Sequence, residues 1–381
     1  MKSIYLDYAA ATPQAPEVTR AAAKYAAEFF NPAAVYLAGQ AVADDIQVAR
    51  RQTADLLGAK PAEIIFTSGA TESNNLAIGG VLKSFPKSRV AAAATEHKSV
   101  IEPAKAHSGG RLDIIAVNST GLVEPGALQR AIKPDTLLIS IAYADSELGS
   151  IQSFRGLKPV IEAERHRRRQ AGGQRPLYLH SDVSAAANYL GLHVDRLGVD
   201  LLSLGGGKIY GPKTAGALYV NQQAAIEPLI YGGGQERNLR SGTANAAGIV
   251  GFARALKLVQ SERSAEAQRV GQLKHRLKQA LLAIEGIGFN GQDSRQLPNF
   301  LSFTIPGADG ERLVMKLDQL GLMVGTGAAC NVNFDQPSSA LKAIGLSDAQ
   351  ANATLRLSLG RPTTVKQVDQ AAKLLVQTIT G

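Results

Sequence analysis

Two patterns of hydrophobic and polar positions divide the chain. Over its first two-thirds, short runs rich in Val, Ile, Leu and Ala alternate with segments of helix length. Continuous apolar runs of this kind are typical of strands buried on both faces of a largely parallel sheet that helices cover. The predicted strands span residues 64–67, 90–94, 112–117, 136–143, 177–182, 201–204 and 215–220.

The pattern changes to long amphipathic helices in the last third of the chain. One apolar stripe at spacings of three and four consists of Val270, Leu273, Leu277 and Leu281. Strand-like runs follow at 300–305 and 355–359, and a capping box of Thr364 and Gln367 predicts the start of a last helix. We therefore expect a large α/β domain over residues 15–250, with ligands at the carboxyl ends of its strands, and a small α+β domain formed by residues 1–14 and 251–381.

Composition narrows the class of protein. The 381 residues are 45% hydrophobic and 19% charged, which is typical of a globular chain. Asp7 stands where a signal peptide would be apolar, and no apolar run reaches the length of a membrane span. A single cysteine, Cys330, excludes an internal disulfide and a multi-cysteine metal site. We expect a cytoplasmic protein with no metal, in which Cys330 is either a small core residue or a reactive thiol.

The net charge is +9, and the densest basic run covers residues 165–169. This run follows apolar positions at helical spacing, so it fits either a solvated helix end, where cations oppose the dipole, or a docking surface. No aromatic residues interleave with the run to stack on bases. We expect no direct contact with nucleic acid and no membrane contact.

Three segments carry candidate chemistry. The strand over 64–67 ends in small residues before a helix that begins near Ala70 and Thr71, and free N–H groups at such a helix start can bind phosphate. Asp182 lies at the end of another buried strand, where a carboxylate needs a positive partner. That partner could be a protonated ring nitrogen, but a helix cap or a structural ion pair would explain the acid equally well.

The third segment contains three glycines, Gly205, Gly206 and Gly207, directly before Lys208. Glycines let the backbone approach a ligand closely, and a lysine beside a buried cofactor can form a Schiff base. Most lysines are simply solvated, so Lys208 indicates a cofactor site only in combination with other motifs of the sequence.

Taken together, a series of motifs resembles the cysteine desulfurase family along essentially the whole chain. The matching segments are residues 5–10, 67–75, 96–98, 208–213, 232–237, 240–243 and 355–361. The family is a branch of fold-type I, the aspartate-aminotransferase-like fold of pyridoxal 5'-phosphate (PLP) enzymes, and forms homodimers. The resemblance implies removal of sulfur from L-cysteine to give L-alanine.

The resemblance also implies roles for single residues. Lys208 would hold PLP, His97 would stack on its ring and Asp182 would pair with the ring nitrogen. The phosphate would lie against Ala70, Thr71, Gly205, Gly206 and Gly207, with Thr243 reaching it from the neighbouring subunit. Asn31 and Arg356 would bind the substrate carboxylate, the latter through its two-pronged guanidinium. Alternation along the strand over 355–359 would turn Arg356 away from the apolar face.

By the same resemblance, Cys330 lies in the family's nucleophile loop. Its thiolate would take the sulfur as a persulfide and deliver it to an acceptor protein. The interval between Cys330 and Arg356 is similar to that of the long-loop subgroup, which supplies iron–sulfur scaffold proteins and tRNA-thiolation enzymes.

The chain departs from the family pattern around the cofactor. Gly205 and Gly207 replace a serine and a histidine that bind the phosphate, and Ala185 replaces a glutamine that touches the phenolic oxygen. Ser146 replaces an asparagine near the ring, and residues 31–36 alter the Asn-Pro-Ser-Ser-x-His motif. Since each lost hydrogen bond is worth about 0.5–1.5 kcal/mol, we expect PLP to be held less tightly, mainly by backbone groups and Lys208.

Three functions are compatible with this sequence. The first is an active cysteine desulfurase. The second is a related PLP lyase or transferase with another amino-acid substrate, which the presence of both Cys330 and Arg356 disfavours. The third is a weakly active or inactive scaffold that binds sulfur-trafficking partners, a function suggested by the changes at the cofactor site.

Overall fold

The computed structural model describes residues 3–173, 175–326 and 337–381. Within these residues the larger part is built on a seven-stranded sheet in the order β2-β8-β7-β6-β5-β3-β4. The strands are β2 (Ile64–Thr67), β3 (Arg89–Ala93), β4 (Leu112–Ile115), β5 (Thr136–Ser140), β6 (Tyr178–Asp182), β7 (Leu201–Gly205) and β8 (Gly216–Val220). Only β8 runs antiparallel to its neighbours among these paired strands. The prediction of a mostly parallel sheet is confirmed, although β5 ends three residues before the predicted run does.

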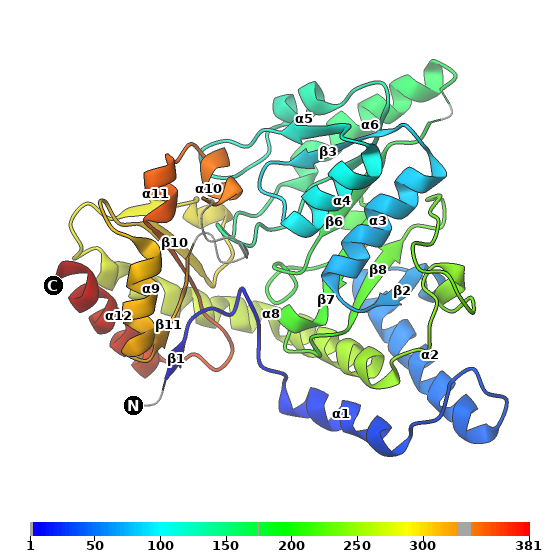
Figure 1. Cartoon of the computed structure of the whole chain (residues 1–381), viewed down its shortest axis with the longest axis horizontal. Helices are drawn as coiled ribbons and strands as arrows, with labels where there is room; N and C mark the ends of the chain where they lie inside the picture. The colour runs from blue at the N-terminus through cyan, green and yellow to red at the C-terminus, as the bar shows by residue number, and fades with distance from the viewer. Residues whose placement is uncertain (1–2, 174, 327–336) are drawn as a thin grey trace.

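Helices cover both faces of this sheet, which explains why its strands carry apolar residues on both sides (Figure 1). The helices of this part are α1 (Pro16–Ala27), α2 (Leu37–Leu57), α3 (Ala70–Ser84), α4 (Lys98–Ser108), α5 (Pro125–Ala131), α6 (Phe154–Gln170) and α7 (Val194–Leu197). In β3, Val90 and Ala92 join the core under α3 and α4, whereas Ala91 and Ala93 join the core on the opposite face. Burial of alternate residues on both sides stabilises the sheet from two directions.

The smaller part contains an antiparallel sheet in the order β12-β13-β10-β9. Its strands are β9 (Gly288–Asn290), β10 (Phe300–Thr304), β12 (Gly325–Thr326) and β13 (Thr354–Ser358), and β1 (Ile4–Tyr5) pairs separately with β11 (Leu322–Met323). The accompanying helices are α9 (Gly310–Gln319), α10 (Ser339–Ala343), α11 (Asp348–Asn352) and α12 (Val365–Thr380). The capping box predicted at Thr364 and Gln367 is confirmed at the start of α12.

One long helix, α8 (Ala246–Leu281), connects the two parts (Figure 1). Its first half contributes Phe252 and Leu256 to the core of the large part, and its second half contributes Leu277 and Leu281 to the core of the small part. The predicted apolar stripe is therefore real, but the helix begins far upstream of it. The predicted domain limits at residues 14 and 250 stay a prediction, since α8 runs continuously past the second of them.

The basic run at the end of α6 is only partly internal to the fold, since His166, Arg167 and Arg169 are exposed. Arg168 is 7% exposed, and its Nη1 donates to the carbonyl oxygen of Thr136 at 2.7 Å. Arg165 pairs with Glu162 and Asp200. These contacts give Arg165 and Arg168 structural roles, whereas the exposed residues of the run lie at the helix end, as the first of the two alternatives predicts. In the described part of the chain, no helix is long and apolar enough to cross a membrane.

Candidate active site

A cavity of about 230 Å³ lies at the carboxyl ends of the central strands of the large sheet. A second cavity of about 300 Å³ adjoins it and shares Ala10, Ala70, Thr71, Ser184 and Lys208 with it. The predicted site residues that line one or both cavities are Ala70, Thr71, His97, Ser146, Asp182, Gly205, Gly207, Lys208 and Arg356. The fold thus brings together side chains from both sheets at the position expected for ligands of a parallel sheet.

Lys208 is presented by a tight turn directly after β7. Gly206 begins a single 3-10 turn that ends at Lys208, and its N–H donates to the carbonyl oxygen of Ala215 at 2.7 Å. A Cβ atom on Gly206 would lie 2.5 Å from the carbonyl oxygen of Pro212. The close approach of these backbones requires glycine here. Gly206 is buried behind the turn rather than lining the cavity.

The second cavity is a backbone cradle at the start of α3. Gly69 caps the helix with a φ of 144°, a conformation that favours glycine, and Ala70 and Thr71 are the first two helical residues. N–H groups in a first helical turn have no acceptor within the helix and attract anions. Gly205 approaches so closely that a Cβ atom there would lie 3.0 Å from the backbone nitrogen of Ala70. This geometry fits a phosphate group.

Asp182 is held ionised at the end of β6. Asn74 Nδ2 donates to its Oδ2 at 2.8 Å, and the backbone N–H of Ser184 donates to its Oδ1 at 2.9 Å. Burial alone would raise the pKa of Asp182, but these hydrogen bonds and the charge of Lys208 bring the pKa below its ordinary value. A stable negative charge in the cavity suits a cationic ring nitrogen, so the residues present fit a pyridine cofactor such as PLP.

His97 caps α4 and is linked to Asp182 through two side chains. Its Nδ1 accepts from the backbone N–H of Ser99 at 3.0 Å and lies 2.8 Å from Ser99 Oγ. Ser99 Oγ in turn accepts from Asn74 Nδ2 at 2.9 Å. Because Nδ1 is an acceptor, the neutral ring carries its proton on Nε2. Burial and the charge of Lys208 lower the pKa of His97, which favours that neutral form.

Glu96 places a second carboxyl group beside the first. It is 5% exposed, and its Oε1 accepts from the backbone N–H of Ala142 at 2.6 Å. Its Oε2 has no hydrogen-bond partner among the described residues. Burial and the neighbouring charge of Asp182 raise the pKa of Glu96 to about 8. The pKa values of the two acids therefore differ strongly: Asp182 is ionised and Glu96 is protonated near neutral pH.

Arg356 enters the cavity from β13 of the small sheet. Leu355 and Leu357 on either side of it pack into the core of the small part, which confirms the predicted alternation. The Arg356 side chain is 3% exposed, and its Nη2 donates to Asp7 Oδ1 at 2.7 Å. Its Nη1 donates to the carbonyl oxygen of Ser146 at 3.1 Å, while its buried Nε has no partner among the described residues.

Two further acids surround this guanidinium. Asp145 and Glu147 flank Ser146, and burial raises the pKa of both, with their mutual repulsion adding to the effect for Glu147. The positive charge of Arg356 opposes this effect and lowers both pKa values. Arg356 is therefore the positive centre around which this end of the cavity is organised, and a carboxylate ligand would add to its existing partners.

Two of the predicted site residues, Asn31 and Thr243, lie away from the two cavities. Asn31 is exposed between α1 and α2, where its Oδ1 accepts from the backbone N–H of Ala33 at 2.9 Å. Thr243 is exposed shortly before α8, and neither residue is among the described residues that line the two cavities. Cys330 lies outside the described residues. The roles of these three residues stay predictions.

The sequence alone predicts no role for several residues that lie at the site. Asp7, Asn74 and Glu96 stand within the motifs at residues 5–10, 67–75 and 96–98, but their burial and partners follow from the fold and not from the motif. Ser184 was missed entirely, although its Oγ accepts from the backbone N–H of Gly205 at 3.2 Å. Its place two residues after Asp182 was the available signal. Among the described residues, no group of three or more His, Cys, Asp or Glu side chains could hold a metal ion.

Known proteins show the same arrangement of sequence and fold. Residues 4–371 match the sequence profile described as aminotransferase class-V. The chain is 36% identical to the cysteine desulfurase IscS of Dictyoglomus turgidum, covering 99% of this chain and 95% of that protein. It is 37% identical to a cysteine desulfurase IscS of Archaeoglobus fulgidus, covering 97% and 95%. A solved NifS-like protein superposes with a TM-score of 0.90 at 30% identity, covering 99% of both chains.

Proposed function

Because the chain belongs to the class-V aminotransferase family, which it matches from residue 4 to residue 371, we propose that it is a PLP-dependent cysteine desulfurase. Relatives of this name cover nearly its full length, and the solved NifS-like structure has the same fold. The reaction removes sulfur from L-cysteine and leaves L-alanine. The cofactor is PLP, as in the family.

One observation supports this function most directly: Lys208, Asp182 and Arg356 line a single cavity. The lysine amine comes from the turn after β7, the carboxylate from the end of β6 and the guanidinium from the other sheet. An amine, an acid and an arginine at such a site provide a covalent anchor for PLP, a partner for its ring nitrogen and a partner for the substrate carboxylate. An inactive scaffold would have no need for this set.

PLP supplies an electron sink when bound, which makes the bonds around the substrate α-carbon easier to break. The residues of the chain do the rest. Asp182 remains negative and so favours a protonated ring nitrogen. His97 presents a neutral ring whose Nε2 proton faces away from its bond with Ser99, which suits stacking and proton movement. The N–H groups in the N-terminal turn of α3 would hold the phosphate, with Gly205 and Gly207 lining the same cavity.

The sulfur carrier in this proposal is Cys330. Its thiolate would attack the substrate sulfur as the carbon–sulfur bond breaks, leaving the electron pair of that bond on the carbon that becomes the methyl group of L-alanine. The sulfur would stay on Cys330 as a persulfide and then pass to an acceptor protein such as an iron–sulfur scaffold or a tRNA-thiolation enzyme. The support for this step is the match of residues 324–333 to the family's nucleophile loop. We further propose a homodimer in which the exposed Thr243 reaches the partner's cofactor. A role for Asn31 at the substrate carboxylate and a cytoplasmic location also stay predictions.

Two substitutions test the proposal. Lys208→Ala should abolish the visible absorption band of covalently bound PLP while the protein folds normally, and Lys213→Ala, at an exposed lysine nearby, serves as its matched control and should keep the band. Cys330→Ser should keep the band but release almost no sulfide from L-cysteine under reducing conditions, because a hydroxyl cannot carry persulfide. Near-normal sulfide release from Cys330→Ser would contradict the sulfur-carrier role. A band that survives Lys208→Ala would move the anchor to another lysine.

A further inference from the structure

The proposed reaction requires the amine of Lys208 and the guanidinium of Arg356, and these two groups are carried by different sheets. Lys208 follows β7 of the large sheet, and Arg356 lies in β13 of the small sheet. A reaction that needs both requires a fixed distance between the two sheets. The contacts that set this distance lie next to both residues in sequence, two positions after Lys208 and shortly after Arg356.

Tyr210 is the first of these contacts. Its side chain is 3% exposed, and its backbone adopts a φ of 62°, a left-handed conformation that is costly for a residue with a side chain. The Tyr210 N–H donates to Thr12 Oγ1 at 2.7 Å, and its carbonyl oxygen accepts from the N–H of Ala15 at 2.9 Å. Its hydroxyl accepts from the N–H of Arg361 at 2.8 Å. Two distant segments of the chain, residues 12–15 and the turn after β13, therefore converge on one strained residue, a pattern that points to function.

Thr12 extends this junction to the lysine turn itself. Its N–H and its Oγ1 both donate to the carbonyl oxygen of Gly207 at 3.0 Å, directly before Lys208. From the other side, Asn188 Nδ2 donates to the carbonyl oxygen of Lys208 at 2.7 Å. These hydrogen bonds fix the backbone on both sides of Lys208. Tyr210 is connected to them because its N–H donates to Thr12 Oγ1.

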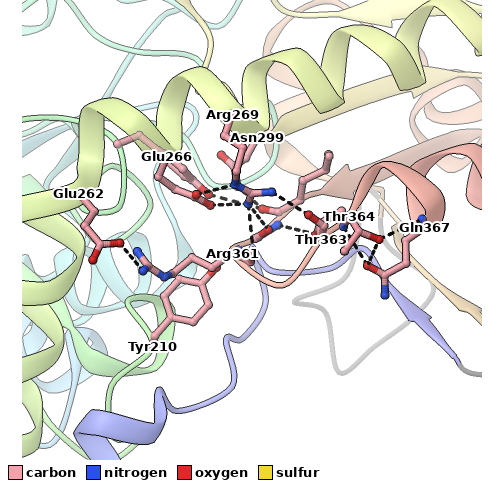
Figure 2. A network of polar contacts seen from close by, with 12 residues as sticks. Tyr210, Glu262, Glu266, Arg269, Asn299, Arg361, Thr363, Thr364 and Gln367 are labelled. Atoms are coloured by element: carbon pink, nitrogen blue, oxygen red, sulfur yellow. Dashed lines mark hydrogen bonds and ion pairs between the residues drawn. The ribbon is translucent and has the colours of Figure 1, made fainter.

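The turn after β13 is fixed from a third direction by α8. Figure 2 shows Arg269 of α8 reaching across to this turn. Its Nη1 donates to the carbonyl oxygen of Thr363 at 2.7 Å, and its Nη2 donates to that of Gly360 at 2.9 Å. Glu266, one turn earlier in α8, holds the guanidinium through two bonds of 2.8 Å. The same figure shows Glu262 paired with the Arg361 side chain beside the Tyr210 ring.

We propose that Tyr210 is a positioning residue that ties the Lys208 turn to the turn following Arg356, and thereby sets where the substrate carboxylate lies relative to the cofactor-binding amine. Arg269 supports the same turn from α8. This inference rests on the proposed function, because it assigns the carboxylate to Arg356 and the cofactor to Lys208. Neither Tyr210 nor Arg269 is among the described residues lining the two cavities, so each acts through its neighbours.

The test removes one hydroxyl group. Tyr210→Phe keeps the ring and the backbone conformation and loses only the bond from the Arg361 N–H. Tyr178→Phe is the matched control, since Tyr178 is also buried and its hydroxyl accepts from the backbone N–H of Ala225 at 3.0 Å, away from the cavity lining. Binding of the product L-alanine, followed by the change in PLP absorption, measures placement of the carboxylate without sulfur chemistry.

Tyr210→Phe should weaken L-alanine binding about two- to tenfold and raise KM for L-cysteine by a similar factor, with a smaller change in kcat, since one hydrogen bond is lost. Tyr178→Phe should lower thermal stability comparably but leave L-alanine binding unchanged. In an Arg356→Ala background the effect of Tyr210→Phe on L-alanine binding should disappear, because the two residues act in series.

Two outcomes would overturn the inference. One is unchanged L-alanine binding and KM in Tyr210→Phe, with only the loss of thermal stability seen in Tyr178→Phe. The other is an undiminished effect of Tyr210→Phe when Arg356 is absent. Failure of the proposed function is distinguishable from both, since the unaltered protein would then show no PLP band or no response to L-cysteine.

Discussion

At one end of the active-site cavity, charge is held by side chains, whereas the other end is built mainly from backbone. Arg356 is fixed by Asp7 and lies among further acids, so the charged contacts there depend on particular side chains. The phosphate end consists of the first turn of α3, where the donors are N–H groups, and of the adjacent backbone of Gly205 and Gly207. Backbone donors persist whatever the side chains are.

This difference explains why the departures from the family pattern gather where they do. Loss of a serine and a histidine at Gly205 and Gly207 leaves the helix N-terminus and its N–H groups intact. Loss of Arg356 would leave Asp7 without its buried counter-charge as well as removing the substrate contact. The backbone end therefore tolerates change that the side-chain end does not, and substitutions at the two ends should differ accordingly.

The largest effect is expected at the side-chain end. Arg356→Ala should lower kcat/KM for L-cysteine by about 100-fold or more, since two charge-assisted bonds of about 1.5–3 kcal/mol are lost in a closed site. Arg356→Lys should recover only part of this, because an ammonium group lacks the planar fork. Steady-state kinetics with L-cysteine measures both.

Arg168→Ala provides the control for loss of a buried arginine. Arg168 is 7% exposed and bonded to backbone carbonyls far from the cavity lining, so its removal should lower thermal stability and leave kcat/KM close to that of the unaltered protein. If Arg356→Ala and Arg356→Lys both matched the unaltered protein, the assignment of the substrate carboxylate to Arg356 would be wrong.

A second effect concerns how the stability of the protein depends on pH through the buried acid Glu96. The pKa of Glu96 is raised to about 8, so the folded chain keeps a proton that the unfolded chain releases near the ordinary value of 4.5. The associated stability is complete below about pH 4.5 and is lost as the pH rises towards 8. Glu96→Gln should therefore reduce the fall in melting temperature between about pH 5.5 and 9 in protein freed of PLP.

Glu102→Gln is the matched control, because Glu102 lies on the adjacent helix α4 with its side chain 61% exposed. It should leave the pH dependence of the melting temperature unchanged. Glu147 has a raised pKa too and should account for part of the remaining slope. Equal slopes for the unaltered protein and Glu96→Gln would show that Glu96 is ionised in the folded chain.

The comparison of the two ends also shows what the sequence could and could not predict. Continuous apolar runs predicted every strand of the large sheet, because burial on both faces leaves a simple signal. The motifs placed Lys208, Asp182, His97 and Arg356, and the fold brings all four to one cavity. The Asp7–Arg356 pair joins residues at opposite ends of the chain. Such a contact depends on strand pairing between distant segments, which no local pattern encodes.

The raised pKa of Glu96 could not be predicted for a similar reason. Its neighbours in sequence are polar, and its burial depends on packing against β5 and the loop after it. The strained φ of Tyr210 likewise depends on Thr12 and Arg361, which are far away in the sequence. Local sequence gives the residue types at a site, whereas distant contacts set their charge and position.

The smallest effect is expected at the backbone end, and it distinguishes the three glycines from one another. None of Gly205, Gly206 and Gly207 has a positive φ, so a side chain would meet no backbone strain. Space decides instead. A Cβ atom on Gly207 meets its nearest neighbour, Lys213 Cα, at an ordinary 3.5 Å, whereas one on Gly205 lies 3.0 Å from the Ala70 nitrogen and one on Gly206 lies 2.5 Å from the Pro212 oxygen.

Gly207→His should therefore tighten PLP binding by about two- to tenfold, the worth of one hydrogen bond, in a Lys208→Ala background that removes the covalent linkage. Gly205→Ser should gain less or lose affinity, since it crowds an N–H of the cradle, and Gly206→Ala should destabilise the turn. PLP dissociation followed by absorption measures all three, and equal behaviour of Gly207→His and Gly205→Ser would show that the approach of the Gly205 turn to α3 does not limit the phosphate site.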